Sequence, residues 1–291
     1  MDGASAMVYN SFAMSTLYLV ATPIGNLEDI SKRATRILGE VKLIAAEDTR
    51  RTRRLLAAYN IRTPLTSYYE HNKKSKLPYL LECLGDGDVA LVSDAGMPGI
   101  SDPGYELVQA AIERGITIVP IPGPSVLPTA IAVSGLPVNQ FIYLGFLPRK
   151  KGERRRLLES IEKEQRTIVT LEAPHRLQAV LSDIKEVLGD RRLAVCRELT
   201  KLHEEVFRGT VSQAIVHFSN PRGEFTLVIE GHIPEGRTRE VTESIREELR
   251  QMRNQGMPAK EAVAQLAAVT KLPKKVLYKT WLELSVPFGF S

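Results

Sequence analysis

The sequence predicts an α/β protein made of two α/β domains and a small helical module at the C-terminus. In the first half of the chain, apolar runs of strand length alternate with amphipathic helical patterns. Strand and helix patterns then continue in a mixed order, and the C-terminal part carries helical patterns only. With 43% hydrophobic and 25% charged residues among 291, the composition is that of a globular protein large enough for more than one core. No apolar stretch approaches the roughly 18 residues of a membrane span.

The N-terminal α/β domain is predicted over residues 16–134. Its strands are expected at 17–21, 43–46, 89–92 and 116–120, and its helices at 29–38, 49–59, 104–114 and 125–133. The strands are apolar throughout instead of alternating with polar residues. This pattern indicates a parallel sheet that is covered by helices on both faces.

A Gly/Pro-containing segment, SGLPVNQ at 134–140, marks the predicted boundary to a second α/β domain over residues 140–232. Its strands are expected at 141–145, 167–171, 192–196, 205–211 and 225–231, and its helices at 152–164, 175–188 and 210–218. The last two strands are expected to close a mixed sheet as an antiparallel pair. A polar linker at 232–240 leads to a helical module at 241–286, whose last two helices are joined by a tight turn, as in helix-turn-helix units.

The first 15 residues are expected to form a flexible tail, with Met14 as an alternative start. The tail carries Asp2 and no basic residue before Lys32, which is not the pattern of a secretory signal peptide. The two cysteines, Cys83 and Cys196, lie far apart in apolar patterns without a CxxC or Cys/His cluster. They are expected to be buried thiols in a reducing cytosol, and no structural zinc site is expected.

Four loops follow strands of the predicted parallel sheet at the edge where ligands bind in such folds. They are TPIGN after the first strand, EDTRR after the second, SDAGMPGISDPG after residue 92 and IPGPS at 121–125. None matches GxGxxG or GxxxxGK[ST], so a pyrophosphate cradle is not supported. Pro23 has no N–H to offer a phosphate, which favours a neutral, partly apolar ligand such as an adenosine.

These loops also carry a family resemblance. LVATPIGNLEDIS, AAEDTRRT, VSDAGMPGISDPG, IPGPS, FLPRKKGERRR, EAPHRL, CRELTKLHEEVFRGT and GEFTLVIEG resemble the successive motifs of the tetrapyrrole methylase superfamily, and more closely its RNA-modifying branch. The resemblance covers about residues 17–285. It implies a cytoplasmic, S-adenosylmethionine-dependent enzyme without a metal. Such enzymes 2′-O-methylate a cytidine ribose in the decoding region of 16S ribosomal RNA in the small ribosomal subunit, and they form homodimers.

The resemblance further implies that the cofactor lies folded between the two α/β domains. The loop at 93–101 is expected to form its main wall, and Asp94 to accept hydrogen bonds from the cofactor. Departures from the family pattern are conservative: Met97 and Ala173 stand where a small polar residue and a serine are expected. Asp102, just before a helix, is expected to be a capping residue. The full set of expected cofactor contacts is Pro23, Gly25, Asp94, Ala95, Gly96, Met97, Ser125, Leu171 and Thr226.

Methyl transfer to a ribose hydroxyl is helped by a base that accepts the hydroxyl proton. Asp48 follows the second strand at the same edge of the sheet as the cofactor loop, so it is the first candidate for this role. Glu198 and Glu172 are the second candidates.

Two basic runs are expected to contact RNA phosphates, because one begins at the proposed catalytic edge and the other leads into the second domain. The residues are Arg50, Arg51 and Arg54 in the first run, and Arg149, Lys150, Arg154, Arg155 and Arg156 in the second. The C-terminal helices favour nucleic-acid binding and a role as a packing module about equally.

Two other functions fit parts of the sequence. The chain is alternatively a small-molecule methyltransferase that acts on a tetrapyrrole such as a precorrin or uroporphyrinogen. A non-catalytic RNA-binding or ribosome-assembly factor is a third interpretation. The two basic runs and the third helical module exceed what a tetrapyrrole substrate requires.

Overall fold

A computed structural model describes residues 15–234, 241–270 and 272–284 of the chain. The tail expected at the N-terminus, with Met14, lies outside these residues except for Ser15, as does most of the polar linker. The contacts within the chain separate it into two units, residues 1–231 and 232–291. In the part of the chain that the structure covers, no helix is both long and apolar enough to cross a membrane.

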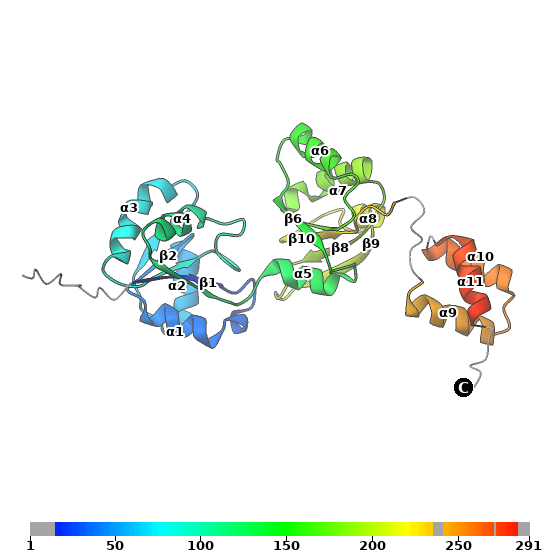
Figure 1. Ribbon diagram of the computed structural model, residues 1–291, viewed down its shortest axis with the longest axis horizontal. Coiled ribbons are helices and arrows are strands. Elements are labelled where there is room, and N and C mark those ends of the chain that lie inside the picture. The colour runs from blue at the N-terminus through cyan, green and yellow to red at the C-terminus, as the bar shows by residue number, and fades with distance from the viewer. Residues whose placement is uncertain (1–14, 235–240, 271, 285–291) are drawn as a thin grey trace, which may run out of the picture. The chain divides into compact units, whose positions relative to one another are not determined.

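The first sheet of the α/β unit is parallel throughout, as predicted (Figure 1). Its order is β3-β2-β4-β1-β5, with β1 at Thr16–Val20, β2 at Leu43–Ala46, β3 at Leu65–Ser67, β4 at Val89–Val92 and β5 at Thr117–Ile121. Its helices are α1 at Lys32–Glu40, α2 at Thr49–Ala58, α3 at Lys73–Leu84 and α4 at Tyr105–Glu113. β3 and α3 were not among the predicted elements, because the short strand is only half-buried and the helix has no clear apolar stripe.

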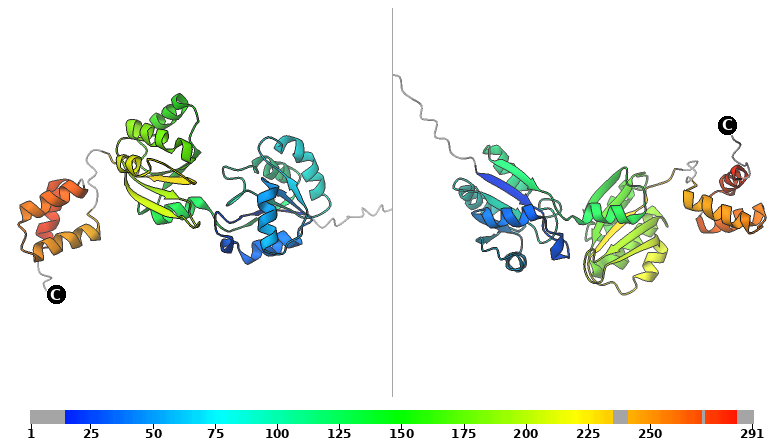
Figure 2. Two further views of the ribbon diagram at one scale, coloured as in Figure 1. Left: turned by 180° about the vertical axis from the view of Figure 1, so that it is seen from behind. Right: turned by 90° about the horizontal axis from the view of Figure 1, so that it is seen from below.

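Neighbouring residues of each strand point to opposite faces of this sheet, and both faces are covered. On β2, Leu43 and Ala45 pack with α3 and α4, while Ile44 and Ala46 pack with α1 and α2. Figures 1 and 2 show α1 on one side of the sheet and α3 and α4 on the other. This double burial explains why the strands carry no polar alternation.

The second sheet is mixed, in the order β6-β7-β10-β8-β9. The strands are β6 at Phe141–Phe146, β7 at Thr167–Glu172, β8 at Arg192–Arg197, β9 at Glu205–Thr210 and β10 at Phe225–Ile229. Three helices, α6 at Lys151–Ser160, α7 at Pro174–Leu188 and α8 at Val211–His217, pack on one face. The expected pairing of the last two strands is wrong, because β8 lies between β9 and β10 and is antiparallel to both.

Helix α5, at Val126–Ser134, packs on the second sheet, although it directly follows β5 of the first. Ala130 and Ile131 lie against Val169, Ala194 and Val228 on the face opposite α7 (Figure 1). The sequence assigned this helix to the first domain. Both faces of the first sheet are already covered, so the apolar side of α5 is buried on the uncovered face of the second sheet instead.

The cysteines differ in burial. Cys196 is buried in the core beside α5, as predicted, whereas Cys83 on α3 is only half-buried. Both are free thiols.

Within its described residues, 241–270 and 272–284, the second unit contains three helices, in agreement with the predicted helical module. They are α9 at Glu243–Asn254, α10 at Ala259–Thr270 and α11 at Lys274–Glu283. Leu249, Leu266, Leu277 and Trp281 form their shared core. Arg253 of α9 lies over the Trp281 ring at 5.7 Å and adds a cation–π contact to that core.

Candidate active site

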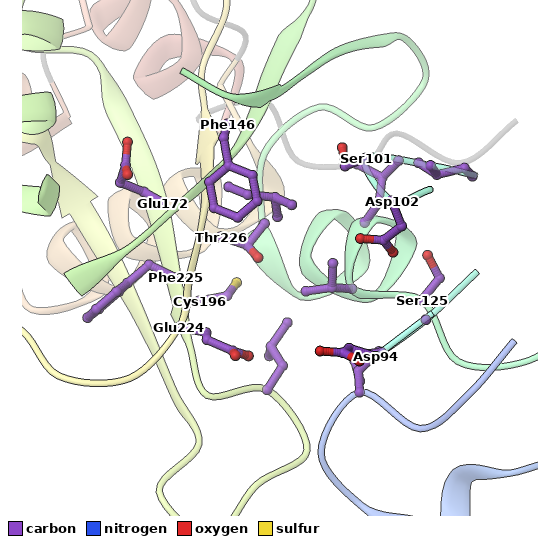
Figure 3. A pocket seen from close by; sticks show the side chains of 18 of the residues that line it. Asp94, Ser101, Asp102, Ser125, Phe146, Glu172, Cys196, Glu224, Phe225 and Thr226 are labelled. Atoms are coloured by element: carbon purple, nitrogen blue, oxygen red, sulfur yellow. The ribbon is translucent and has the colours of Figure 1, made fainter. Parts of the chain in front are cut away.

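A cavity of about 440 Å³ lies between loops of the two sheets within the α/β unit. This volume is within the range of small-molecule sites. Figure 3 shows Asp94, Ser101, Asp102 and Ser125 on one wall and Glu172, Cys196, Glu224 and Thr226 on the other. The loops that follow β1, β2, β4 and β5 all contribute lining residues, so they lie along one edge as predicted.

Backbone hydrogen bonds hold the loops after β1 and β4 together. The amide of Thr22 donates to the carbonyl of Gly96, and the amide of Gly96 donates back to Thr22, both at 2.9 Å. The Thr22 hydroxyl also donates to the carbonyl of Ser93 at 3.1 Å. The wall formed by residues 93–97 is therefore fixed before any ligand arrives.

The loops after β2 and β4 are joined by carboxylates. The amide of Asp94 donates to Glu47 Oε2 at 3.1 Å, and the amide of Asp48 donates to Asp94 Oδ1 at 3.0 Å. Arg51 of α2 lies 3.4 Å from the other oxygen of Asp94. Asp94 thus faces the cavity with one oxygen held by a backbone amide and the other beside a guanidinium.

Asp102 lines this wall and is not a helix cap. The N-cap residue of α4 is Gly104, and the cap makes no side-chain hydrogen bond. Burial raises the pKa of Asp102 to about 7, and the nearby negative charges of Glu47 and Asp94 act in the same direction. Burial also raises the pKa of Glu47. Sequence reasoning missed Asp102 as a site residue because Asp-Pro-Gly before a helix is ordinary capping chemistry.

The second wall is built around an ion-pair cluster. Lys201 Nζ lies 2.9 Å from both Glu198 Oε1 and Glu224 Oε2, and the Glu224 amide donates to Glu198 at 2.8 Å. Burial acts to raise the pKa of Glu198, but the hydrogen bonds from Lys201 and the Glu224 amide outweigh it and lower the pKa. Glu172, at the end of β7, is also part of this wall and pairs with Arg176 at 3.2 Å.

Most of the predicted cofactor contacts are brought together. Asp94, Ala95, Gly96, Met97, Ser125, Leu171 and Thr226 all line the cavity. Pro23 and Gly25 do not, although Ile24 between them does. A Cβ at Gly25 would lie 2.5 Å from the Lys201 side chain and 2.7 Å from the Thr200 hydroxyl, so this glycine serves the close approach of two loops.

The candidate bases are placed differently from one another. Asp48 caps α2 by accepting from the Arg50 amide at 2.8 Å, and its carboxylate also pairs with the Arg50 guanidinium. These hydrogen bonds hold the pKa of Asp48 far below its usual range. Asp48 is not among the cavity-lining residues, whereas Glu198, Glu172 and Asp102 are.

The second basic run contains one buried arginine. Arg154 is only 5% exposed, and its Nε donates to Asp183 at 2.8 Å. This burial contradicts the prediction that Arg154 contacts RNA, because its guanidinium is already enclosed and paired. Arg155 is half-buried and pairs with Glu186 at 2.7 Å. The other predicted RNA contacts are exposed: Arg50, Arg51, Arg54, Arg149, Lys150 and Arg156.

The cavity suits a ligand that carries positive charge and an aromatic ring. Among the described residues, six acidic side chains line it against two cations, Arg51 and Lys201. Apolar side chains, including Val126, Leu127 and Leu171, complete the lining. Two lining residues other than glycine, Ser101 and Glu198, have left-handed backbone at φ 65° and 49°, a conformation that is enriched at functional sites. The sulfonium and ammonium groups and the adenine of S-adenosylmethionine fit this chemistry.

Comparison with known families gives a match over residues 16–215 to the model "Tetrapyrrole (Corrin/Porphyrin) Methylases". Three proteins named "Ribosomal RNA small subunit methyltransferase I" are similar to the chain. The Synechocystis protein is 50% identical over 93% of this chain and 99% of its own length. The Bacillus subtilis protein is 46% identical over 92% and 94%, and the Thermotoga maritima protein is 55% identical over 75% and 99%.

Solved structures give the same fold at low sequence identity. Uroporphyrin-III-C-methyltransferase from Thermus thermophilus superposes with a TM-score of 0.52 at 20% identity, over 74% of this chain and 94% of that protein. The cobalt precorrin-4 methyltransferase CbiF superposes with a TM-score of 0.56 at 16% identity, over 74% and 95%.

Proposed function

Because this chain belongs to the tetrapyrrole methylase family, we propose that it is an S-adenosylmethionine-dependent methyltransferase of ribosomal RNA. We propose more specifically that it 2′-O-methylates a cytidine ribose in the 16S RNA of the small ribosomal subunit. The observation that carries it is the 50% identity to a protein named for ribosomal RNA, over 93% of this chain and 99% of that one. A shared fold alone would not distinguish an RNA substrate from a small molecule.

The cavity lining supports the cofactor assignment. When bound, S-adenosylmethionine supplies an electrophilic methyl group on a positively charged sulfur. Asp94 and Asp102 would stabilise positive charge from one wall, while Leu171 and Thr226 would contact the ligand from the other. The amide-fixed loop at 93–97 needs no rearrangement to form this site, which reduces the entropic cost of binding.

For the base that accepts the 2′-hydroxyl proton, we favour Asp102 over Asp48. A base works best when its pKa lies near the working pH. The pKa of Asp102 is raised by burial to about 7, whereas the hydrogen bonds of Asp48 to Arg50 leave it a very weak base. Glu198 faces the cavity but is neutralised by Lys201, which makes it the second choice.

The pH dependence of methyl transfer tests this assignment. Only the carboxylate form of Asp102 accepts a proton, so the single-turnover rate should rise with pH and level off above about pH 7. Asp102→Asn should abolish this rise and lower the rate by about 10²- to 10⁴-fold at saturating cofactor.

Asp48→Asn is the matched control and should keep the rate within about threefold of wild type, because Asp48 lies outside the cavity lining. A large loss in Asp48→Asn together with a normal rate in Asp102→Asn would reverse the assignment.

A tetrapyrrole substrate is the alternative function. The two solved tetrapyrrole methyltransferases named above are 20% and 16% identical to the chain, so they support the fold alone. The macrocycle carries several carboxylates, and the six acidic side chains of the cavity would repel it. The near-full-length RNA-named relatives also argue against a tetrapyrrole substrate.

Labelling with methyl-tritiated S-adenosylmethionine tests the function directly. The substrates are small ribosomal subunits from cells that lack the endogenous methyltransferase, naked 16S RNA, and uroporphyrinogen. The expected product is labelled 2′-O-methylcytidine after digestion of the RNA to nucleosides. Label in uroporphyrinogen, or in a base instead of a ribose, would overturn the proposal. Absence of label from all three would favour a non-catalytic assembly factor.

We further propose, from the family resemblance, that the protein is a homodimer in the cytoplasm.

We also propose that the helical unit has an accessory role. The Thermotoga maritima relative is matched over 99% of its length by only 221 aligned residues, about the size of the α/β unit. Removal of residues 235–291 should therefore leave cofactor affinity unchanged in calorimetry. Light scattering of the intact chain would test the dimer.

A further inference from the structure

The segment 145–149 presents an aromatic ring at the cavity. Phe146 lines the cavity although its side chain is 54% exposed. The register of β6 on β7 shifts between Tyr143 and Phe146, and Gly145 has a left-handed φ of 62°. A β-bulge of this kind redirects a side chain, and here it directs the Phe146 ring into the cavity (Figure 3).

Side-chain donors from β7 and α7 hold the backbone of this segment. The hydroxyl of Thr170, which is fully buried, donates to the Gly145 carbonyl at 2.7 Å. Arg176 Nη2 donates to the carbonyls of Leu147 at 2.6 Å and Pro148 at 3.2 Å. The segment is therefore anchored through its backbone, while the Phe146 ring remains open to solvent.

Arg154 anchors the other end of the segment. Its Nη1 donates to the carbonyls of Pro148 at 3.2 Å and Arg149 at 3.1 Å, while Asp183 accepts from its Nε. Burying a guanidinium is costly unless it is fully paired. The buried Arg154 and the half-buried Arg176 thus fix the three consecutive carbonyls of residues 147–149, which directly follow Phe146.

An exposed ring followed by exposed cations is the arrangement that binds a single nucleotide. Nucleobases stack on aromatic side chains, and cations contact the phosphate beside them. The cavity has to receive a ribose hydroxyl under the proposed function, so the target nucleotide leaves its stack, and its base needs a new stacking surface.

We propose that Phe146 stacks on the base of the target nucleotide while Arg149 contacts its phosphate. Residues 145–149 then form a nucleotide receptor, and Arg154 and Arg176 are the positioning residues that hold it. The inference rests on the proposed function, because it names how the same site binds RNA. We favour the base of the target nucleotide over the adenine of the cofactor as the group that stacks on Phe146. The Phe146 ring is half open to solvent and leads directly to exposed cations, whereas buried residues such as Cys196 and Thr226 line the interior.

The chain offers a matched control on the same strand. Phe141 is 42% exposed at the start of β6 but does not line the cavity. Phe146→Ala should raise the KM for small subunits by about 5- to 150-fold, as expected for loss of one base–aromatic stack. Phe146→Trp should restore it, Phe141→Ala should leave it unchanged, and the affinity for S-adenosylmethionine should stay at the wild-type value in all three variants.

A second measurement separates stacking from charge. Arg149→Gln should reduce the salt dependence of RNA affinity by about one unit of log–log slope, whereas Phe146→Ala should lower the affinity without changing the slope. Both are measured by filter binding in the presence of S-adenosylhomocysteine, so they do not require turnover.

The outcomes that overturn the inference are distinct. A loss of cofactor affinity in Phe146→Ala equal to the loss in RNA affinity would mean that the ring packs on the adenine. If Phe146→Ala leaves both the KM and the RNA affinity unchanged, Phe146 does not stack on the base. If the wild-type protein binds RNA but methylates none, the proposed function fails, while the binding comparison of Phe146→Ala with Phe141→Ala still decides the stacking.

Discussion

The two basic runs look alike in the sequence but meet different surroundings in the structure. On α2, the arginines at 50, 51, 53 and 54 are all exposed, and the buried positions of that helix are Thr52, Leu55 and Leu56. On α6, Arg154 shares the buried face with Leu158, while Arg156 is exposed. One run is therefore a solvent-facing charged surface, and the other is divided between the surface and the core.

This difference shows that the role of a charge run depends on the face of the helix that each residue occupies. Residues four positions apart lie on the same face, so Arg154 and Leu158 point the same way. The first run places its cations at the cavity edge, where Arg51 lies beside Asp94. The second run uses one cation to hold the backbone that presents the others.

The largest expected effect is on stability. Arg154→Met leaves Asp183 buried and unpaired, which should cost about 3–5 kcal/mol of unfolding free energy. Arg156→Met should change it by no more than about 0.5 kcal/mol, because Arg156 is exposed. Urea unfolding of the two variants measures both values. The double variant Arg154→Met/Asp183→Leu should recover most of the loss, and equal stabilities of the two single variants would break the comparison.

The next effect is on RNA binding. Replacing the exposed cations of either run by Gln should reduce the salt dependence of RNA affinity by about three units of log–log slope. The two sets are Arg50, Arg53 and Arg54 on α2, and Arg149, Lys150 and Arg156 around α6. The control set is Lys32, Arg33 and Arg36, which are exposed on α1 and outside both runs. If the salt-dependence slope falls as much in the control as in either set, the basic runs do not contact RNA phosphates more than other exposed cations do.

The smallest effect distinguishes two neighbours within the first run. Arg51 lines the cavity, whereas Arg50 pairs with Asp48 outside it. S-adenosylmethionine carries one more positive charge than S-adenosylhomocysteine, so the positive charge of Arg51 should weaken its binding more. Arg51→Gln should therefore raise the affinity for S-adenosylmethionine relative to that for S-adenosylhomocysteine by about two- to fivefold at low salt. Arg50→Gln should leave this ratio unchanged in calorimetry, and a shift of the same size in both variants would contradict the placement of Arg51.

Much of the fold could be predicted because continuous apolar strands have few alternatives to a doubly covered parallel sheet. The order of the second sheet could not be predicted, since β8, β9 and β10 are all compatible with antiparallel neighbours and only packing selects among them. β3 was missed because three half-buried residues carry no periodic signal. The position of α5 depends on which sheet face is free, and this is a tertiary property.

For the site, seven of the nine cofactor contacts predicted from the motifs line the cavity, while the roles of individual side chains required geometry. Asp48 and Glu47 are adjacent in sequence, but only Glu47 faces the cavity. The sequence did contain the signal for Arg154, because Arg154, Leu157, Leu158 and Ile161 follow helical spacing on one face. No local pattern signals Asp102, whose pKa is raised by burial and by the negative charges of Glu47 and Asp94.

Helix α5 has a consequence for how the α/β unit comes apart. It is joined to β5 of one sheet but covers Val169, Ala194 and Val228 of the other. A fragment that begins at residue 140 would lose this cover and expose an apolar sheet face, which favours aggregation. The second sheet therefore lacks a complete hydrophobic core when the chain is cut at 134–140, whereas the core of the first sheet lies wholly before this boundary. Helix α5 and the second sheet are expected to unfold together, as one cooperative unit that crosses the predicted boundary.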